Sequence, residues 1–385
     1  MSTRAENVAA LRASYAELVP GQKVEAGPFR PEDAPGVGRL FLQVYGDDYP
    51  VDEPYVPELL TEANATGRIH TIIVRVPDGS IVGQGAIFRS SPPNTRMYEY
   101  GQMLVDKAYR NSFAAYRLHQ YASKNMFGKL PGIDALYGEA VCHHIITQKM
   151  SVAVDFFECG LELGLMPEAA YAGEGVDGRV SCLLHIRLDE VGQGPLVIPA
   201  CWREQIEATL PTWPLVREVS VSGPEVAAPA GSVSDTDVRH FDFAGVTRVQ
   251  VASIGADFAQ CVARDIAAAK QRDYAVVQFF VSLGQGWTGQ AAEILRQAGG
   301  FYAGFFPQWF GQAGSGPDAL LVQLYLEPIK LAPVMANAER GATVIRRVVA
   351  DMLRAGREFG APVASPLPDL ETLAQPTVKS SSKDE

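Results

Sequence analysis

The chain has 385 residues, of which 47% are hydrophobic and 20% charged, and its formal net charge at pH 7 is −11. This length favours two domains over one, and the composition is ordinary for a globular protein with a sizeable core. The acidic excess disfavours nucleic acid or an anionic membrane as a partner of the whole surface. No apolar run approaches the roughly 20 residues of a membrane helix, and the N-terminus lacks a signal-peptide hydrophobic region, so we predict a cytoplasmic protein.

The cysteines are odd in number and scattered, and no two of them form a CxxC pair. This pattern predicts neither a disulfide framework nor a thiolate zinc site, and we expect buried thiols and no bound metal. The residues concerned are Cys142, Cys159, Cys182, Cys201 and Cys261.

The first half of the chain alternates helical and strand patterns. In chain order we expect a helix at 1–22, a strand at 24–30, helices within 31–50 and 58–64, strands at 68–76, 81–90 and 97–105, a helix at 110–126, a strand at 135–141, a helix ending near 154, and strands at 156–165 and 179–188. Asp78-Gly79 is a strong hairpin signal between two of these strands. A helix joins 97–105 to 135–141, so these two strands should be parallel neighbours with a right-handed crossover.

A basic island interrupts the acidic chain between residues 107 and 133, where no Asp or Glu occurs. Its cations are Lys107, Arg110, Arg117, Lys124 and Lys129. Three of them are spaced seven apart, which predicts a stripe on one side of a helix. A strand, a loop and the start of a basic helix together form an anion site, so we predict a bound phosphate here; the alternative is a solvated basic face.

Two segments carry a family resemblance. Residues 110–115 read RNSFAA, and residues 138–167 read GEAVCHHIITQKMSVAVDFFECGLELGLMP. With the element order, these segments resemble the GNAT superfamily of acyl-CoA N-acyltransferases over residues 24–190. The first is similar to the family loop R/Q-x-x-G-x-G/A, with Phe113 in place of the central glycine. The second is similar to a bacterial subgroup with the strand motif E-A-V-T-x-H, although Cys142, Thr147 and Asp155 depart from it.

The resemblance implies an α/β (α+β) fold: a mixed, mostly antiparallel sheet with a splayed parallel central pair. It also implies acetyl-CoA or another acyl-CoA as co-substrate. Backbone groups of Gln102, Met103, Leu104 and Val105 would pair with pantetheine, and the diphosphate would lie on Arg110, Asn111, Ser112, Phe113, Ala114 and Ala115. Arg117 or Lys124 would meet the 3′-phosphate, and Gln148 would complete the cofactor contacts.

Acyl transfer to an amine needs a base, a stabilised oxyanion and a protonated leaving thiolate. The base candidates are Glu99, Glu139 and His144. For each we also weigh a structural role: Glu99 as a solvent-side strand residue, Glu139 as an ion-paired acid and His144 as a loop histidine. A backbone N–H of 103–105 is the expected oxyanion donor. The family often uses a tyrosine as acid where this chain has Ser151, so Tyr98, Tyr100 and Tyr109 are alternatives. A metal or nucleophile role for Cys142-His143-His144 is disfavoured, because adjacent strand residues point to opposite sides.

The second half repeats the last six elements of the first. We expect strands at 246–254, 275–283, 301–307 and 319–326 with helices at 256–272 and 288–297. The loop at 253–258 carries Asp257 and no cation, so this truncated GNAT-like copy should not bind coenzyme A. Lys330–Phe359 predicts a helical segment interrupted at Gly341. The aromatic residues Phe305, Phe306, Trp309 and Phe310 indicate an interdomain or subunit contact, including a homodimer through the C-terminal domain.

The predicted domains are an N-terminal helix (1–23), an acyl-CoA-binding domain (24–190), a connector and linker (191–245), a degenerate copy (246–328), a helical segment (329–375) and a disordered tail (376–385). The predicted function is N-acyl transfer to an amine of a small molecule or protein whose identity the sequence does not specify. The alternative is a scaffold that binds acyl-CoA or protein partners without catalysis.

Overall fold

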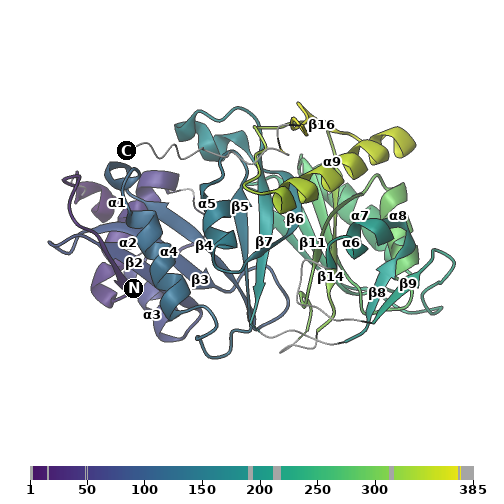
Figure 1. Ribbon diagram of the computed structural model, residues 1–385, viewed down its shortest axis with the longest axis horizontal. Coiled ribbons are helices and arrows are strands. Elements are labelled where there is room, and N and C mark those ends of the chain that lie inside the picture. Colours follow the sequence, from purple (N-terminus) through teal and green to yellow (C-terminus); the bar gives the residue numbers. More distant parts are fainter. Residues whose placement is uncertain are drawn as a thin grey trace, which may run out of the picture. The chain divides into compact units, whose positions relative to one another are not determined.

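The computed structural model describes residues 3–14, 17–47, 49, 51–189, 194–210, 218–311, 316–371 and 373 (Figure 1). The chain divides into two compact units, Met1–Gly138 (unit 1) and Glu139–Glu385 (unit 2). This division falls inside a strand, β5 (Ala135–Val141), and not near residue 190, so the predicted domain limits remain a prediction. In the described ranges no helix is both long and apolar enough to cross a membrane. The predicted tail lies outside those ranges.

Unit 1 is a sheet with helices packed against it (Figure 1). The strand order is β1-β2-β3-β4-β5; β4 and β5 are parallel and the other neighbours antiparallel. In addition to β5, the elements are α1 (Arg4–Ala13), β1 (Glu25–Pro28), η1 (Pro31–Asp33), α2 (Ala34–Tyr45), α3 (Pro57–Ala65), β2 (Ile69–Arg75), β3 (Ile81–Phe88), β4 (Met97–Val105), η2 (Lys107–Tyr109) and α4 (Ala114–Asn125). The predicted apolar stripe of α2 forms a core with β2 and β3 through Val37, Leu40 and Phe41.

Unit 2 contains a sheet in the order β7-β6-β13-β14-β12-β11-β10. Its helices and strands after β5 are α5 (Ile146–Val152), β6 (Phe157–Met166), η3 (Glu168–Glu174), β7 (Val180–Leu188), β8 (Leu196–Pro199), η4 (Ala200–Trp202), α6 (Arg203–Glu207), β9 (Val219–Ser222), β10 (Asp235–Phe241), β11 (Val246–Ser253), α7 (Phe258–Gln271), β12 (Val276–Ser282), α8 (Thr288–Gln297), β13 (Phe301–Phe306), β14 (Ala319–Tyr325), β15 (Ile329–Lys330), α9 (Glu339–Phe359) and β16 (Ala364–Ser365). In this sheet β11 and β12 are parallel and the other neighbours antiparallel. The predicted mixed, mostly antiparallel architecture is therefore confirmed.

Four expected elements differ in the structure. The predicted helix at 1–22 is shorter, because α1 ends at Ala13. The basic helix α4 begins at Ala114 and not at Arg110, because 110–113 form a turn in which the Ser112 hydroxyl accepts from the Ala114 amide at 3.1 Å. The helix α9 runs through Gly341 without interruption. A Cβ on Gly341 would lie 3.0 Å from Leu183, so this glycine permits close packing and does not end the helix. The predicted linker at 222–235 leads directly into a strand, β10, that the sequence analysis missed.

The histidine His185 gives unit 2 a predicted pH dependence. It is buried on β7, its Nδ1 lies 3.0 Å from the carbonyl oxygen of Leu183, and burial lowers its pKa to about 4. The unfolded chain, with a histidine pKa of about 6.5, binds a proton that the folded chain rejects between these values. Stability should therefore fall as the pH falls from about 6.5 to about 4, by up to about 3 kcal/mol.

Denaturant unfolding at pH 7 and pH 4.5 measures this effect. We expect His185→Asn to lose less stability on acidification than the wild type, since the titrating group is gone. The neighbouring carboxyl of Glu158 opposes the effect, because burial raises its pKa and the folded form then binds the proton more readily. Equal losses of stability on acidification in the two proteins would contradict the assignment of the pH dependence to His185.

Candidate functional site

The parallel strands β4 and β5 pair only over their first residues. Within the described ranges their register partners run from Met97–Ala135 to Glu99–Tyr137, while β4 continues to the Val105–Gly83 pair with β3. We call the point where the pairing with β5 stops, at Glu99 and Tyr137, the fork. The parallel central pair is therefore confirmed, and its splay stays a prediction.

The side chains at the fork are hydrogen bonded. The Tyr137 hydroxyl donates to Oε2 of Glu99 at 2.8 Å and lies 2.5 Å from the Ser90 hydroxyl. Tyr137 is buried and Glu99 half-buried. A Cβ on Gly101 would lie 2.9 Å from Oε1 of Glu99, so the glycine leaves room for this carboxylate. The predicted base candidate Glu99 is thus fixed at the fork.

Just beyond the fork, β4 is irregular. The register with β3 shifts between the Gln84–Leu104 and Ala86–Gly101 pairs, and Gln102 has a φ of 52°. A bulge of this kind turns peptide groups out of the regular ladder. The Gln84 side chain donates to the carbonyl oxygen of Gln102 at 2.5 Å, and the side-chain amide of Gln102 donates to the Tyr49 hydroxyl at 3.1 Å. The predicted pantetheine edge, Gln102 to Val105, therefore starts at a bulge that side chains hold in place.

The loop at 110–115 joins this edge to α4. Arg110, Asn111 and Ser112 are exposed, and Phe113 is the N-cap with a φ of −80° and its ring 73% exposed. At this φ a Cβ causes no strain, so the loop does not need the family's glycine for its conformation. In the described part of unit 1, no acceptor is present for the amides of Ala115 and Tyr116. Two amides thus lie at the start of the helix, and the exposed cation Arg110 lies in the turn before it.

The remaining cations of the island lie on or beyond α4. Arg117 and Lys124 are exposed, two turns apart on the helix, and Arg117 Nη1 donates to Gln120 Oε1 at 2.9 Å. Arg110 lies before the helix, so the predicted stripe consists of two residues on α4 with Arg110 in the preceding turn. Both helix residues stay candidates for a phosphate contact.

The tyrosines that could replace Ser151 as an acid differ in their surroundings. The Tyr100 hydroxyl lies 3.2 Å from Nδ1 of buried His119, and the buried Tyr109 donates to the carbonyl oxygen of Val19 at 2.5 Å. Their hydroxyls belong to interior hydrogen bonds, which disfavours both as acids. Tyr98 is half-buried beside His70, and the Arg89 guanidinium lies over its ring at 5.6 Å.

The other predicted site residues belong to unit 2. Oε1 of Glu139 lies 3.7 Å from Nη2 of Arg248, which is the structural, ion-paired role left open by the sequence. The rings of His143 and His144 lie edge to face at 4.6 Å, and the ring of Tyr171 lies 5.0 Å from that of His143. These contacts do not favour catalytic roles for Glu139 and His144.

Gln148 has a structural environment that does not support the predicted cofactor contact. Its side chain is buried, its amide nitrogen donates to the carbonyl oxygen of Met335 at 3.0 Å, and its Oε1 accepts from the Asn337 amide at 2.9 Å. The residue therefore holds the segment before α9. The nearby Cys142 is also buried, which raises the pKa of its thiol to about 12 and disfavours a thiolate role.

The strand-loop-helix junction at 253–258, which the sequence analysis compared with the loop at 110–115, is closed. β11 and β12 stay in register over six pairs, from Val246–Val276 to Val251–Val281. The amides of Ile254, Gly255 and Ala256 donate to the side chains of Gln285, Ser234 and Ser232 at 2.6, 2.9 and 3.1 Å. The carboxylate of Asp257 accepts from the Ser234 amide and hydroxyl, each at 2.8 Å. The protein's own side chains therefore satisfy the groups that would bind a phosphate.

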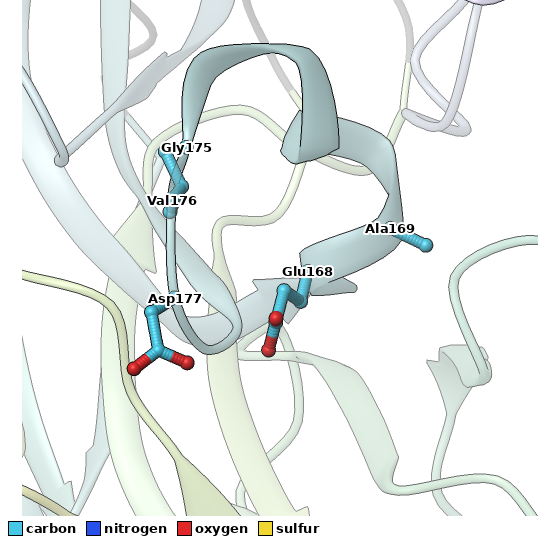
Figure 2. A pocket seen from close by; sticks show the side chains of 5 residues that line it. All are labelled: Glu168, Ala169, Gly175, Val176 and Asp177. Atoms are coloured by element: carbon cyan, nitrogen blue, oxygen red, sulfur yellow. The ribbon is translucent and has the colours of Figure 1, made fainter.

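A hollow lies at the surface of unit 2. Glu168, Ala169, Gly175, Val176 and Asp177 line it (Figure 2). Oε2 of Glu168 accepts from the Gly178 amide at 2.9 Å, and Asp177 pairs with Lys330. Across the described ranges no cluster of three or more His, Cys, Asp or Glu could hold a metal ion.

Sequence reasoning missed Tyr49, Ser90 and Tyr137. Tyr137 lies in the strand pattern ALYGEAV, and nothing in that pattern indicates a hydrogen-bonded hydroxyl. Tyr49 lies in a turn-rich stretch that Arg4 of α1 holds, through hydrogen bonds of 2.7 Å to the carbonyl oxygen of Tyr49 and 2.9 Å to Asp52. No local pattern signals a contact between residues so far apart in the chain.

Comparisons with known proteins find structural similarity at low sequence identity. No protein-family model and no curated protein matches the sequence. The structure is similar to an N-acetyltransferase from Staphylococcus aureus Mu50 (14% identity, TM-score 0.35, 44% of this chain and 99% of that one). It is also similar to the ribosomal-protein-S5-alanine acetyltransferase from Vibrio fischeri (10%, 0.33, 44% and 96%) and the spermidine/spermine N-acetyltransferase from Vibrio cholerae (14%, 0.32, 43% and 93%).

Proposed function

We propose that unit 1 binds acetyl-CoA or a related acyl-CoA beside the fork and transfers the acyl group to an amine. The observation that carries the proposal is the end of the β4–β5 pairing at Glu99 and Tyr137. Parallel strands that separate leave one edge of β4 open to an extended ligand, which can pair with its backbone as an added strand would. The bulge at Gln102 then orients the peptide groups along this edge.

The phosphates would lie at the start of α4. Backbone amides at a helix N-terminus and a neighbouring guanidinium suit a diphosphate, because both act on its negative charge. Ala115 and Tyr116 supply the amides and Arg110 the guanidinium, with Arg117 or Lys124 for the 3′-phosphate.

The chemistry assigned to the chain is general base and oxyanion catalysis. The amine nitrogen attacks the thioester carbon, a C–N bond forms, and the C–S bond breaks. Glu99 takes one proton from the nitrogen, and the departing sulfur takes one from solvent, so the products are an amide and a thiol. Peptide N–H groups of 103–105 would stabilise the oxyanion.

The second half of the chain fits a degenerate copy of the same fold. β11, α7 and β12 repeat the parallel crossover of β4, α4 and β5, and each copy contains a strand with a register shift at a glycine. These glycines, Gly160 and Gly304, are register partners of each other. The closed junction at 253–257 supports the proposal that this copy takes no acyl-CoA and serves as a structural partner.

Two observations favour a second candidate, a protein that binds acyl-CoA without catalysis. Ser151 stands where the family often has an acidic tyrosine, and Glu139 is ion-paired with Arg248. Catalysis releases a free thiol from acyl-CoA, whereas binding alone does not.

Thiol release from acetyl-CoA with a panel of primary amines tests the proposed function. We expect amine-dependent release above the rate of acetyl-CoA with protein alone. Polyamines, aminosugars and peptides with a free N-terminus sample the chemical range of acceptors. Binding without release for every amine would contradict the catalytic proposal and favour the scaffold.

A further inference from the structure

Three side chains, from two strands and the loop after β3, meet at the fork. Ser90 follows β3, Glu99 is on β4, and Tyr137 is on β5. Glu99 and Tyr137 are register partners, so their side chains leave the sheet on the same face. The contact therefore links the two parallel strands at the last position where they still pair.

The donors and acceptors of this contact can be assigned. A carboxylate accepts only, and a phenol has a single proton, so Tyr137 donates its proton to Oε2 of Glu99 at 2.8 Å. The Ser90 hydroxyl, 2.5 Å away, must then donate to the Tyr137 oxygen. The result is a series of hydrogen bonds that runs from Ser90 through Tyr137 to Glu99, in which each hydrogen bond strengthens the next.

We propose that Tyr137, supported by Ser90, is a positioning residue that holds the Glu99 carboxylate ionised and aimed at the amine beside the fork. The proposal rests on the proposed function and adds two residues to it. The buried ring of Tyr137 fixes its hydroxyl, and Gly101 leaves the space that the carboxylate fills. A hydrogen bond to the charged form favours that form, so the base stays ready near neutral pH.

Other groups act on the same carboxylate. Its register partner on β3 is the apolar Phe88, and Gly101 follows it on β4. The phenol of Tyr49, on the segment between α2 and α3, is close enough for Glu99 to raise its pKa, although burial and the neighbouring Tyr45 contribute more. Tyr49 is therefore neutral in the working range and adds no charge to the site.

The test is the pH dependence of kcat/KM for thiol release by Tyr137→Phe, which removes one oxygen and keeps the ring. The acid limb of the profile should move to higher pH by about 0.5–1 unit, because the carboxylate loses a donor and holds its proton more tightly. Acetyl-CoA affinity should stay within about twofold, since the backbone edge of β4 is unchanged. Ser90→Ala should shift the limb in the same direction by less.

The matched control is Tyr325→Phe in unit 2. Its buried hydroxyl donates to the carbonyl oxygen of Leu163 at 3.0 Å, so this variant also loses one interior hydrogen bond, but away from the fork. It should leave the pH profile in place. A Tyr137→Phe profile that matches this control, in a protein that turns over, would overturn the positioning role alone. A wild type that binds acetyl-CoA and releases no thiol with any amine would overturn both this role and the proposed function.

Discussion

Replacing Arg248 with methionine is expected to destabilise unit 2 by about 3–5 kcal/mol. Nη2 of Arg248 pairs with Oε1 of Glu162 at 2.6 Å, and its Nε donates to Oε1 of Gln278 at 2.9 Å. The side-chain nitrogen of Gln278 donates to the same Glu162 oxygen at 2.8 Å. Glu162 is fully buried, so removal of the guanidinium would leave a carboxylate without its counter-charge in the interior.

Denaturant unfolding at pH 7 measures this loss, and two variants make it specific. Arg248→Met combined with Glu162→Leu should recover most of the stability, because apolar groups often replace a buried ion pair at little cost. Arg239→Met removes an exposed pair with Asp237 on the adjacent strand β10 and should cost less than about 1 kcal/mol. If Arg248→Met is no more destabilising than Arg239→Met, the pair does not stabilise unit 2.

Glutamate in place of Arg110 is expected to weaken acetyl-CoA binding by roughly 30–100-fold, from the loss of a charge-assisted contact worth about 2–3 kcal/mol. Arg110 is exposed in the turn before α4, and in the described part of the chain no carboxylate pairs with it. The substitution therefore removes a cation from the proposed diphosphate site without opening a core.

Lys129→Glu is the matched control for Arg110→Glu. It makes the same charge change in the same unit at an exposed residue beyond the end of α4. Isothermal titration should give it an affinity within about twofold of the wild type at 0.15 M salt, because exposed charges more than a Debye length apart are screened. Equal losses of acetyl-CoA affinity in both variants would indicate a general effect of net charge and not a phosphate contact.

The elements with regular periodicity could be predicted from the sequence. The 3.6-residue spacing in α2, the Asp78-Gly79 hairpin and the parallel crossover through α4 all depend on local patterns, and each appears in the structure. The edge strand β10 was missed because its sequence, DTDVRHF, has two apolar residues without a regular alternation and follows a segment rich in Pro, Gly and Ser. Gly341 was interpreted as a helix break because sequence alone does not show the β-strand side chain packed against it.

The candidate site was predicted less well, because its residues depend on contacts between distant segments. Glu99 was one of three base candidates, and nothing near it in the sequence indicated the hydroxyl of Tyr137 beside it. Glu139 lies between a glycine and an alanine in an otherwise apolar strand, yet Arg248, more than a hundred positions later, pairs with it. Phe113 departs from the family's glycine, and only its φ of −80° shows that the turn does not require one.

The stoichiometry of acetyl-CoA binding tests the central claim most directly. The pairing of β4 with β5 ends at the fork, whereas β11 and β12 stay paired and the amides at 254–256 are satisfied by side chains. Isothermal titration of the full chain should therefore give one site per chain, and Arg110→Glu should weaken that site. No heat of binding, or two equivalent sites per chain, would contradict the proposed single site at the fork.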